Sequence, residues 1–174
     1  MRLLGSLKRL QRERSGAAAV EMALVIPLLL LLMFGSLELG NYFYSGHRLT
    51  ESVREGARYA ARQGFSNFPC GSATNATVVT DTQNIVRKGE PDTNAVDLLP
   101  NWGASGASIT VSHACVTAAG GQNMEGLYRN NTGGAPVVTV RARVPYQGLV
   151  GALLGFGELN LFLNADQQAA VVGL

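Results

Sequence analysis

The sequence is poor in charged residues and in the side chains that most often hold metal ions. Asp, Glu, Lys and Arg make up 15% of the 174 residues, and the chain has two histidines and two cysteines. His113 and Cys115 are close in sequence, but a structural zinc site needs four such ligands at a recognisable spacing. No such spacing occurs, so we expect no metal site and no cofactor.

The motifs of common catalytic sites are missing as well. Gly103-Ala104-Ser105-Gly106 lacks the second glycine in register for a nucleophile elbow. Gly155-Phe156-Gly157 is not followed by the third glycine of a dinucleotide fingerprint, and there is no P-loop. We therefore expect no catalytic residues and no enzyme.

Positive charge is concentrated at the start of the chain. Residues 1–16 carry a net charge of +4, and the rest of the chain carries −2. Beyond this leader there is no basic patch, so the charge pattern excludes a nucleic-acid partner.

An apolar run from Ala17 to Leu39 follows the basic leader, and no charge lies between Glu21 and Glu38. As a helix at about 1.5 Å per residue, this run crosses a bilayer core of about 30 Å. A cleaved secretory signal fits poorly, because the run is long, begins beside an acid and has no A-x-A motif. Positive charge before a span keeps that end in the cytoplasm. We expect a cytoplasmic leader at 1–16, a transmembrane helix at 17–40 and an extracytoplasmic remainder.

The helix is predicted to continue beyond the membrane, over residues 41–64. Apolar and small residues recur there at three- and four-residue spacing, which gives one stripe suited to packing: Tyr42, Gly46, Leu49, Val53, Ala57 and Ala60. Gly64 is a plausible stop signal. Tyr42, Phe43 and Tyr44 suit an interfacial aromatic belt.

Residues 65–174 predict a small α+β head. A turn-rich connection precedes a short amphipathic helix at 77–88, and alternating patterns predict strands at 108–116, 137–144 and 158–164. The last strand would point Leu159, Leu161 and Leu163 inward, and residues 165–174 extend it or add another. The predicted fold is a long transmembrane helix that continues into a small head, in which a short helix packs on a three- or four-stranded antiparallel sheet.

The apolar connector 146–157 has two interpretations. Its leucines are buried in the head, or Leu149, Leu153, Leu154 and Phe156 rest on the membrane surface or on a neighbouring subunit. We favour the first.

Both cysteines, Cys70 and Cys115, lie in the part predicted to be outside the membrane. An even number of cysteines in an oxidising compartment suggests a disulfide. Closing a loop of about 45 residues contributes about 4 kcal/mol in the chain-entropy model. The alternative is two independent buried thiols.

Glu21 is the residue that a plain signal anchor does not explain. A charge at the bilayer centre costs about 2.5–3.5 kcal/mol, less near the interface, so such residues usually have a partner. A cut after Gly16 would leave a free α-amine at Ala17 and make Glu21 the fifth residue of the mature chain. That amine could pair with the carboxylate of a neighbouring subunit.

The segment RSGAAAVEMALVIPLLLLLMFGSLELG resembles a type IV prepilin processing site and is similar to the TadE-like pseudopilins of the tight-adherence (Tad/Flp) pilus system. The resemblance implies cleavage between Gly16 and Ala17 by a prepilin peptidase in the inner membrane. It gives Glu21 a helix-pairing role and implies other pilin-like subunits and Tad assembly components as partners. The alternative function is an uncleaved single-pass envelope protein that presents a small binding head.

Overall fold

The computed structural model describes residues 14–121, 124–131, 133–154 and 160–173. It divides the chain into two compact units, Met1–Gly40 and Asn41–Leu174. Most of the predicted leader lies outside the described residues.

Helix α2, Arg14–Ala61, is the longest element and contributes to both units. It continues through Pro27 without interruption. In the first unit nearly every described side chain is exposed, including Leu24 at 74% and Leu31 at 68%. A helix that is apolar all round has its favoured surroundings in a membrane or in the core of a large protein.

In the second unit, α2 buries the stripe that its sequence predicts. Leu49, Val53, Ala57 and Ala60 are fully buried. They share a hydrophobic core with the sheet residues Val138, Val140 and Val144. After Ala61, the N–H groups of Arg62 and Gln63 donate to the carbonyls of Tyr59 and Ala60, which closes the helix in a tight last turn.

Helix α3, Ala76–Lys88, begins and ends at residues that suit helix caps. The Asn75 side chain accepts a hydrogen bond from the Thr77 N–H, and Gly89 ends the helix at φ 87°. Gly56 of α2 lies against this helix, because a Cβ atom there would come within 2.5 Å of Val86 Cγ2. The two helices can approach this closely only because residue 56 has no side chain.

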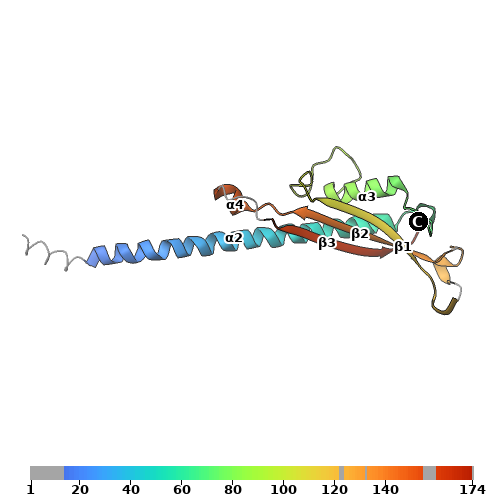
Figure 1. The fold of residues 1–174 in the computed structure, drawn as a ribbon, viewed down its shortest axis with the longest axis horizontal. Helices are drawn as coiled ribbons and strands as arrows, with labels where there is room; N and C mark the ends of the chain where they lie inside the picture. Colours follow the sequence, from blue (N-terminus) through green and yellow to red (C-terminus); the bar gives the residue numbers. More distant parts are fainter. Residues whose placement is uncertain (1–13, 122–123, 132, 155–159, 174) are drawn as a thin grey trace, which may run out of the picture. The chain divides into compact units, whose positions relative to one another are not determined.

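The head has one antiparallel sheet in the order β1-β2-β3, formed by Ser108–Val116, Ala135–Pro145 and Phe162–Ala170 (Figure 1). Alternate residues of β2 face the core, since Val138, Val140, Ala142 and Val144 are at most 4% exposed. Four short helices complete the described elements: η1 at Phe65–Asn67, η2 at Ala119–Gly121, η3 at Gly126–Tyr128 and α4 at Leu149–Leu154. The α+β prediction, with a short helix packed on a three-stranded sheet, is confirmed.

The last strand begins later than its predicted span of 158–164, and residues 165–170 extend it, which is one of the two expected alternatives. β3 begins at Phe162, and Leu161 precedes it with a side chain that is 46% exposed. Pairing with β2 places Leu163 opposite Val144, at the end of the core, so Leu163 is buried and the strand continues through Ala170. Leu159 lies outside the described residues.

The favoured interpretation of the connector is wrong for Leu149. This residue begins α4 and is 57% exposed. Tyr146, at the start of the connector, is buried. The side chains of residues 153, 154 and 156 lie outside the described residues, so the prediction for these three stays a prediction.

Candidate functional site

The predicted processing site lies in the first turn of α2. Gly16 and Ala17 are both exposed, two and three residues after the helix begins at Arg14. A Cβ atom at Gly16 would meet no heavy atom within 4 Å. The fold therefore has room for a larger side chain at this position. If a substitution of Gly16 blocked cleavage, the cause would be poor recognition by the protease and not a disturbed fold.

Glu21 lies on the same helix, one turn after Ala17. Its side chain is exposed, and it has no hydrogen-bond or ion-pair partner among the residues that the structure describes. Gly16, Ala17 and Glu21 thus lie within two turns of α2, and the described residues do not pair with the carboxylate.

The apolar segment after Glu21 is long and apolar enough to cross a membrane, and none of its most apolar window is buried within the protein. Its exposed side chains include Leu24, Ile26, Leu28 and Leu31. Each exposed leucine in water forgoes about 1.5–3 kcal/mol of burial free energy. The described part of the chain is therefore consistent with a single-pass membrane protein.

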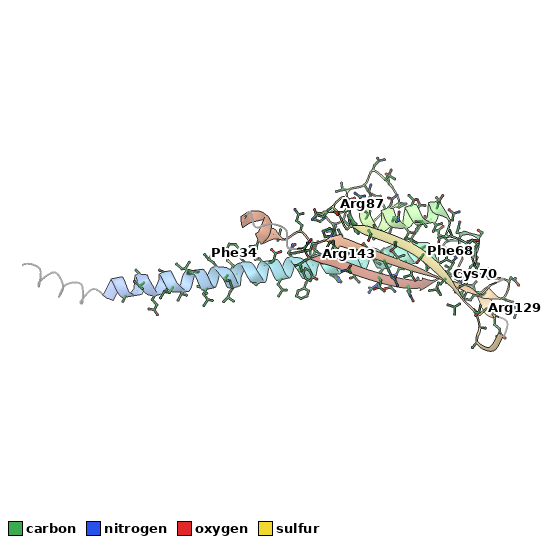
Figure 2. All side chains as sticks on the ribbon, viewed as in Figure 1. Phe34, Phe68, Cys70, Arg87, Arg129 and Arg143 are labelled. Carbon is green, nitrogen blue, oxygen red and sulfur yellow. A yellow bond between two sulfur atoms is a disulfide. The ribbon has the colours of Figure 1, made fainter. Side chains whose placement is uncertain are left out.

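Cys70 and Cys115 form a disulfide with a Cα–Cα distance of 5.7 Å. The bond joins the segment between α2 and α3 to the end of β1, and Phe68 and Cys70 lie in that segment (Figure 2). His113 lies beside it, with Nδ1 2.7 Å from the Thr74 hydroxyl and its ring edge-on to Phe68. These contacts hold the connection against the outer edge of the sheet.

The sheet face opposite the helices is open and polar. Its cross-strand rows pair Ser108 with Arg143 and Asn164, Thr110 with Arg141 and Asp166, and Ser112 with Thr139 and Gln168. The Arg143 guanidinium lies 3.9 Å from the centre of the Phe162 ring, a cation–π contact. A shallow depression of about 360 Å³ lies over the first two rows. It could receive polar groups of either charge, since Asp166 lies beside the two arginines.

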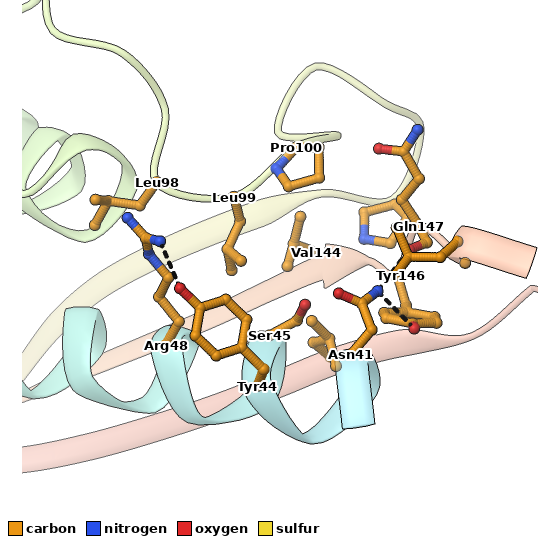
Figure 3. Close-up of a pocket in the computed structure, with 14 residues that line it drawn as sticks. Asn41, Tyr44, Ser45, Arg48, Leu98, Leu99, Pro100, Val144, Tyr146 and Gln147 are labelled. Atoms are coloured by element: carbon orange, nitrogen blue, oxygen red, sulfur yellow. Dashed lines mark hydrogen bonds between the residues drawn. The ribbon is translucent and has the colours of Figure 1, made fainter. Parts of the chain in front are cut away.

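A second hollow, of about 330 Å³, is formed around Asn41, the first residue of the second compact unit, and we name it the Asn41 pocket. The Asn41 amide donates hydrogen bonds to Tyr146 Oη, at 2.8 Å, and to the Gln147 carbonyl, at 3.4 Å (Figure 3). The Tyr146 ring packs edge-on against Tyr42 at 5.1 Å. The helix α2 adds Tyr44, Ser45 and Arg48 to the walls, and the loop before β1 adds Leu98–Pro100. The sheet and the segment after β2 supply the rest: Val144, Pro145, Gln147–Leu149 and Leu163.

An ion pair fixes the loop that forms one wall of this pocket. Arg87 donates to both oxygens of Asp97, at 2.7 and 2.8 Å, and the Leu98 N–H donates to the Arg87 carbonyl. The hydrogen bond to Asp97 raises the pKa of Arg87, against the smaller lowering effect of burial. A bidentate pair of this kind sets the direction of a loop as well as its position.

Within the described residues, no group of three or more His, Cys, Asp or Glu side chains could hold a metal ion. Sequence reasoning missed the Asn41 pocket, because its walls come from segments that are far apart in the chain. Arg48 carried a weak signal, since it is a cation one helical turn beyond a cluster of aromatic residues.

Comparison with protein families identifies the amino-terminal helix. Residues 16–58 match the family model of TadE-like proteins. The matched segment begins at Gly16 and contains Glu21 and the apolar span. It ends at Arg58, shortly before α2 ends at Ala61. The match is confined to α2 and is consistent with a TadE-like pilus protein. No curated protein and no solved structure matches the chain.

Proposed function

We propose that this chain is a pilin-like membrane protein that is needed for assembly of Tad/Flp pili and is cut by a prepilin peptidase between Gly16 and Ala17. One observation carries the proposal. Gly16, Ala17 and Glu21 lie together at the start of a helix whose exposed apolar segment matches the TadE-like family model. The cytoplasmic leader, residues 1–16, would then be absent from the mature protein.

The orientation follows from the charge distribution. The leader carries +4, which keeps it in the cytoplasm and directs the head to the other side of the inner membrane. The Cys70–Cys115 disulfide supports this orientation, because such bonds persist in oxidising compartments. The disulfide-bonded head, residues 65–174, would lie in the periplasm, at the end of a helix extension over residues 41–64.

Cleavage would supply the partner that Glu21 lacks. The cut turns the Ala17 nitrogen into a charged α-amine, and this amine on one subunit can pair with the Glu21 carboxylate of the next. Each charge alone is costly in the membrane, whereas the pair is cheaper and depends on a second subunit. The proposal thus couples processing to association with other pilin-like subunits and Tad assembly components.

The cleavage step is tested by intact mass and amino-terminal sequencing of the protein from native membranes, with and without the peptidase. We expect the wild-type chain to begin at Ala17 only when the peptidase is present. Gly16→Leu should keep Met1 in both cases, because the bulky side chain should not fit before the cut. Gly35→Leu is the matched control, since a Cβ atom there also meets nothing within 4 Å.

Two outcomes would contradict this step. Processing of Gly16→Leu at the wild-type level would refute the proposed site. A wild-type chain that begins at Met1 in both membranes would favour the alternative, an uncleaved single-pass envelope protein that presents its head for binding.

The pairing step is tested separately with Glu21→Gln. We expect this variant to insert and to be cut like the wild type, while piliation and cross-linking to other pilin-like subunits fall severalfold. Glu38→Gln, near the other end of the span, controls for loss of any carboxylate from the same helix. Normal piliation by Glu21→Gln would show that the amine–carboxylate pair is not needed.

A further inference from the structure

The Asn41 pocket combines one cation with apolar walls. Among the described residues that line it, Arg48 is the only charged one, and the apolar lining residues include Leu98, Leu99, Pro100 and Leu149. A small hollow of this composition suits a ligand with an anionic group and an apolar part. A fully hydrated anion would make poor use of the leucines.

Arg48 is available for such a ligand. One guanidinium nitrogen, Nη1, donates to the Tyr44 hydroxyl at 3.0 Å, and none of the ion pairs among the described residues includes Arg48 (Figure 3). Arg58 and Arg87, by contrast, are paired with Glu55 and Asp97. The guanidinium has five N–H donors in a planar fork that matches phosphate oxygens, and Tyr44 occupies one of them.

The chain itself places the pocket next to the membrane-spanning segment. Asn41 directly follows the apolar segment in sequence, and Phe43 and Tyr44 are 64% and 61% exposed, as expected of an interfacial aromatic belt. Helical side chains tilt toward the amino-terminus, so Arg48 reaches back to Tyr44, one turn earlier. An arginine at this depth reaches the level of lipid headgroups.

The rim of the pocket carries an apolar group of its own. Leu149, the first residue of α4, is 57% exposed beside the hollow. An exposed leucine next to an aromatic belt is suited to contact with the glycerol and upper acyl region of a lipid.

We propose that the Asn41 pocket binds the phosphate of an anionic phospholipid in the leaflet nearest the head, with Arg48 as the phosphate ligand. Tyr44 holds the guanidinium in place, and Leu149 contacts the lipid below its phosphate. The bound lipid would fix the height of the head above the bilayer. This inference rests on the membrane insertion of the proposed function, but it does not depend on cleavage or on pilus assembly.

The test measures which lipids stay on the full-length protein. The chain is reconstituted in nanodiscs that contain equal amounts of phosphatidylglycerol and phosphatidylcholine, and the complexes are released and weighed by native mass spectrometry. We expect one retained phosphatidylglycerol per chain. Arg48→Gln should lower its retention about tenfold, because a charge-assisted contact is lost. Arg48→Lys should retain an intermediate amount, and Arg54→Gln, an exposed arginine outside the pocket, should behave like the wild type.

Three results would overturn the inference. They are equal retention by wild type and Arg48→Gln, no preference for the anionic lipid, and displacement of the lipid by millimolar inorganic phosphate, which would indicate a site for free anions. Unchanged Trp102 emission in Arg48→Gln checks that the head remains folded. A chain that begins at Met1 and still retains the lipid through Arg48 would contradict the processing proposal alone. Failure to enter nanodiscs would overturn both.

Discussion

The two halves of α2, residues 14–40 and 41–61, differ in whether the folded protein buries their apolar side chains. The second is the head half. Both halves are rich in apolar residues, yet Leu31 in the first is 68% exposed, whereas Leu49 in the second is fully buried. The second half has its apolar residues on one stripe, and the sheet and α3 cover that stripe. The first half is apolar all round, and no described part of the chain buries it, which is consistent with an apolar medium around it.

The exposed fraction of a leucine side chain therefore has a different meaning in each of the two regions. An exposed leucine in the first half suits contact with lipid or with another helix. An exposed leucine in the head, such as Leu149, is a local departure from a packed core. The two regions meet between Gly40 and Asn41, where one compact unit ends and the next begins in the sequence.

We expect the largest effect when the same substitution is made in each half of α2 and the stability of the head is measured. Leu49→Ala removes a fully buried side chain from the head core, and we expect it to lower the free energy of unfolding by about 3 kcal/mol. Leu32→Ala is the matched control, because Leu32 is 59% exposed. It should leave the stability of the head unchanged.

The measurement is urea unfolding of the full-length protein in detergent, followed by the emission of Trp102. This residue is the single tryptophan of the chain and is 8% exposed in the head core. Equal destabilisation by the two substitutions would mean that the first half of α2 also packs on the folded head, and the distinction between the halves would fail.

Much of the fold could be predicted because the local signals agree with the tertiary packing. The period of the stripe from Leu49 to Ala60 matches its buried face, and β1 has the predicted limits of Ser108 and Val116. The amphipathic pattern at 77–88 predicts α3 to within one residue, since the helix covers Ala76–Lys88. In each case one short segment carries the whole signal.

The failures occurred where distant segments decide the outcome. The limits of β3 follow from its pairing with β2, which places small or polar residues such as Ala165 and Gln167 toward the core. Their sequence has no strong alternation, whereas the leucines just before them do. Gly56 resembles any glycine in a helix until α3 is placed against it.

The candidate site residues also divide into those that a local pattern predicts and those that distant segments bring together. Gly16, Ala17 and Glu21 are a local pattern, so sequence alone could propose them. The Asn41 pocket needs α2, the loop fixed by Arg87 and Asp97, and the end of β2 to come together. Nothing in the sequence near Arg48 indicates that Leu98–Pro100 would lie across from it.

We expect a smaller effect on stability from a single contact between α2 and α3. The Tyr59 hydroxyl donates to Asp81 Oδ2 at 3.0 Å and so joins α2 to α3. Burial, and then the hydrogen bond to Asp81 and its negative charge, raise the pKa of Tyr59 above 10.0. The folded state therefore favours the neutral phenol. The stabilising contribution is fully present below about pH 10 and is lost as the pH rises through the folded-state pKa.

We expect Tyr59→Phe to lower the free energy of unfolding by about 1 kcal/mol at pH 8. The difference from wild type should shrink above pH 10, where the phenolate loses its donor and is repelled by Asp81. The test is the difference between the two proteins in parallel urea titrations, because effects common to both proteins cancel in that difference. Asp81→Asn keeps an acceptor but removes the charge, so its alkaline loss of stability should be shallower. A difference between wild type and Tyr59→Phe that stays constant from pH 8 to 11 would mean that the helix–helix contact does not depend on this proton.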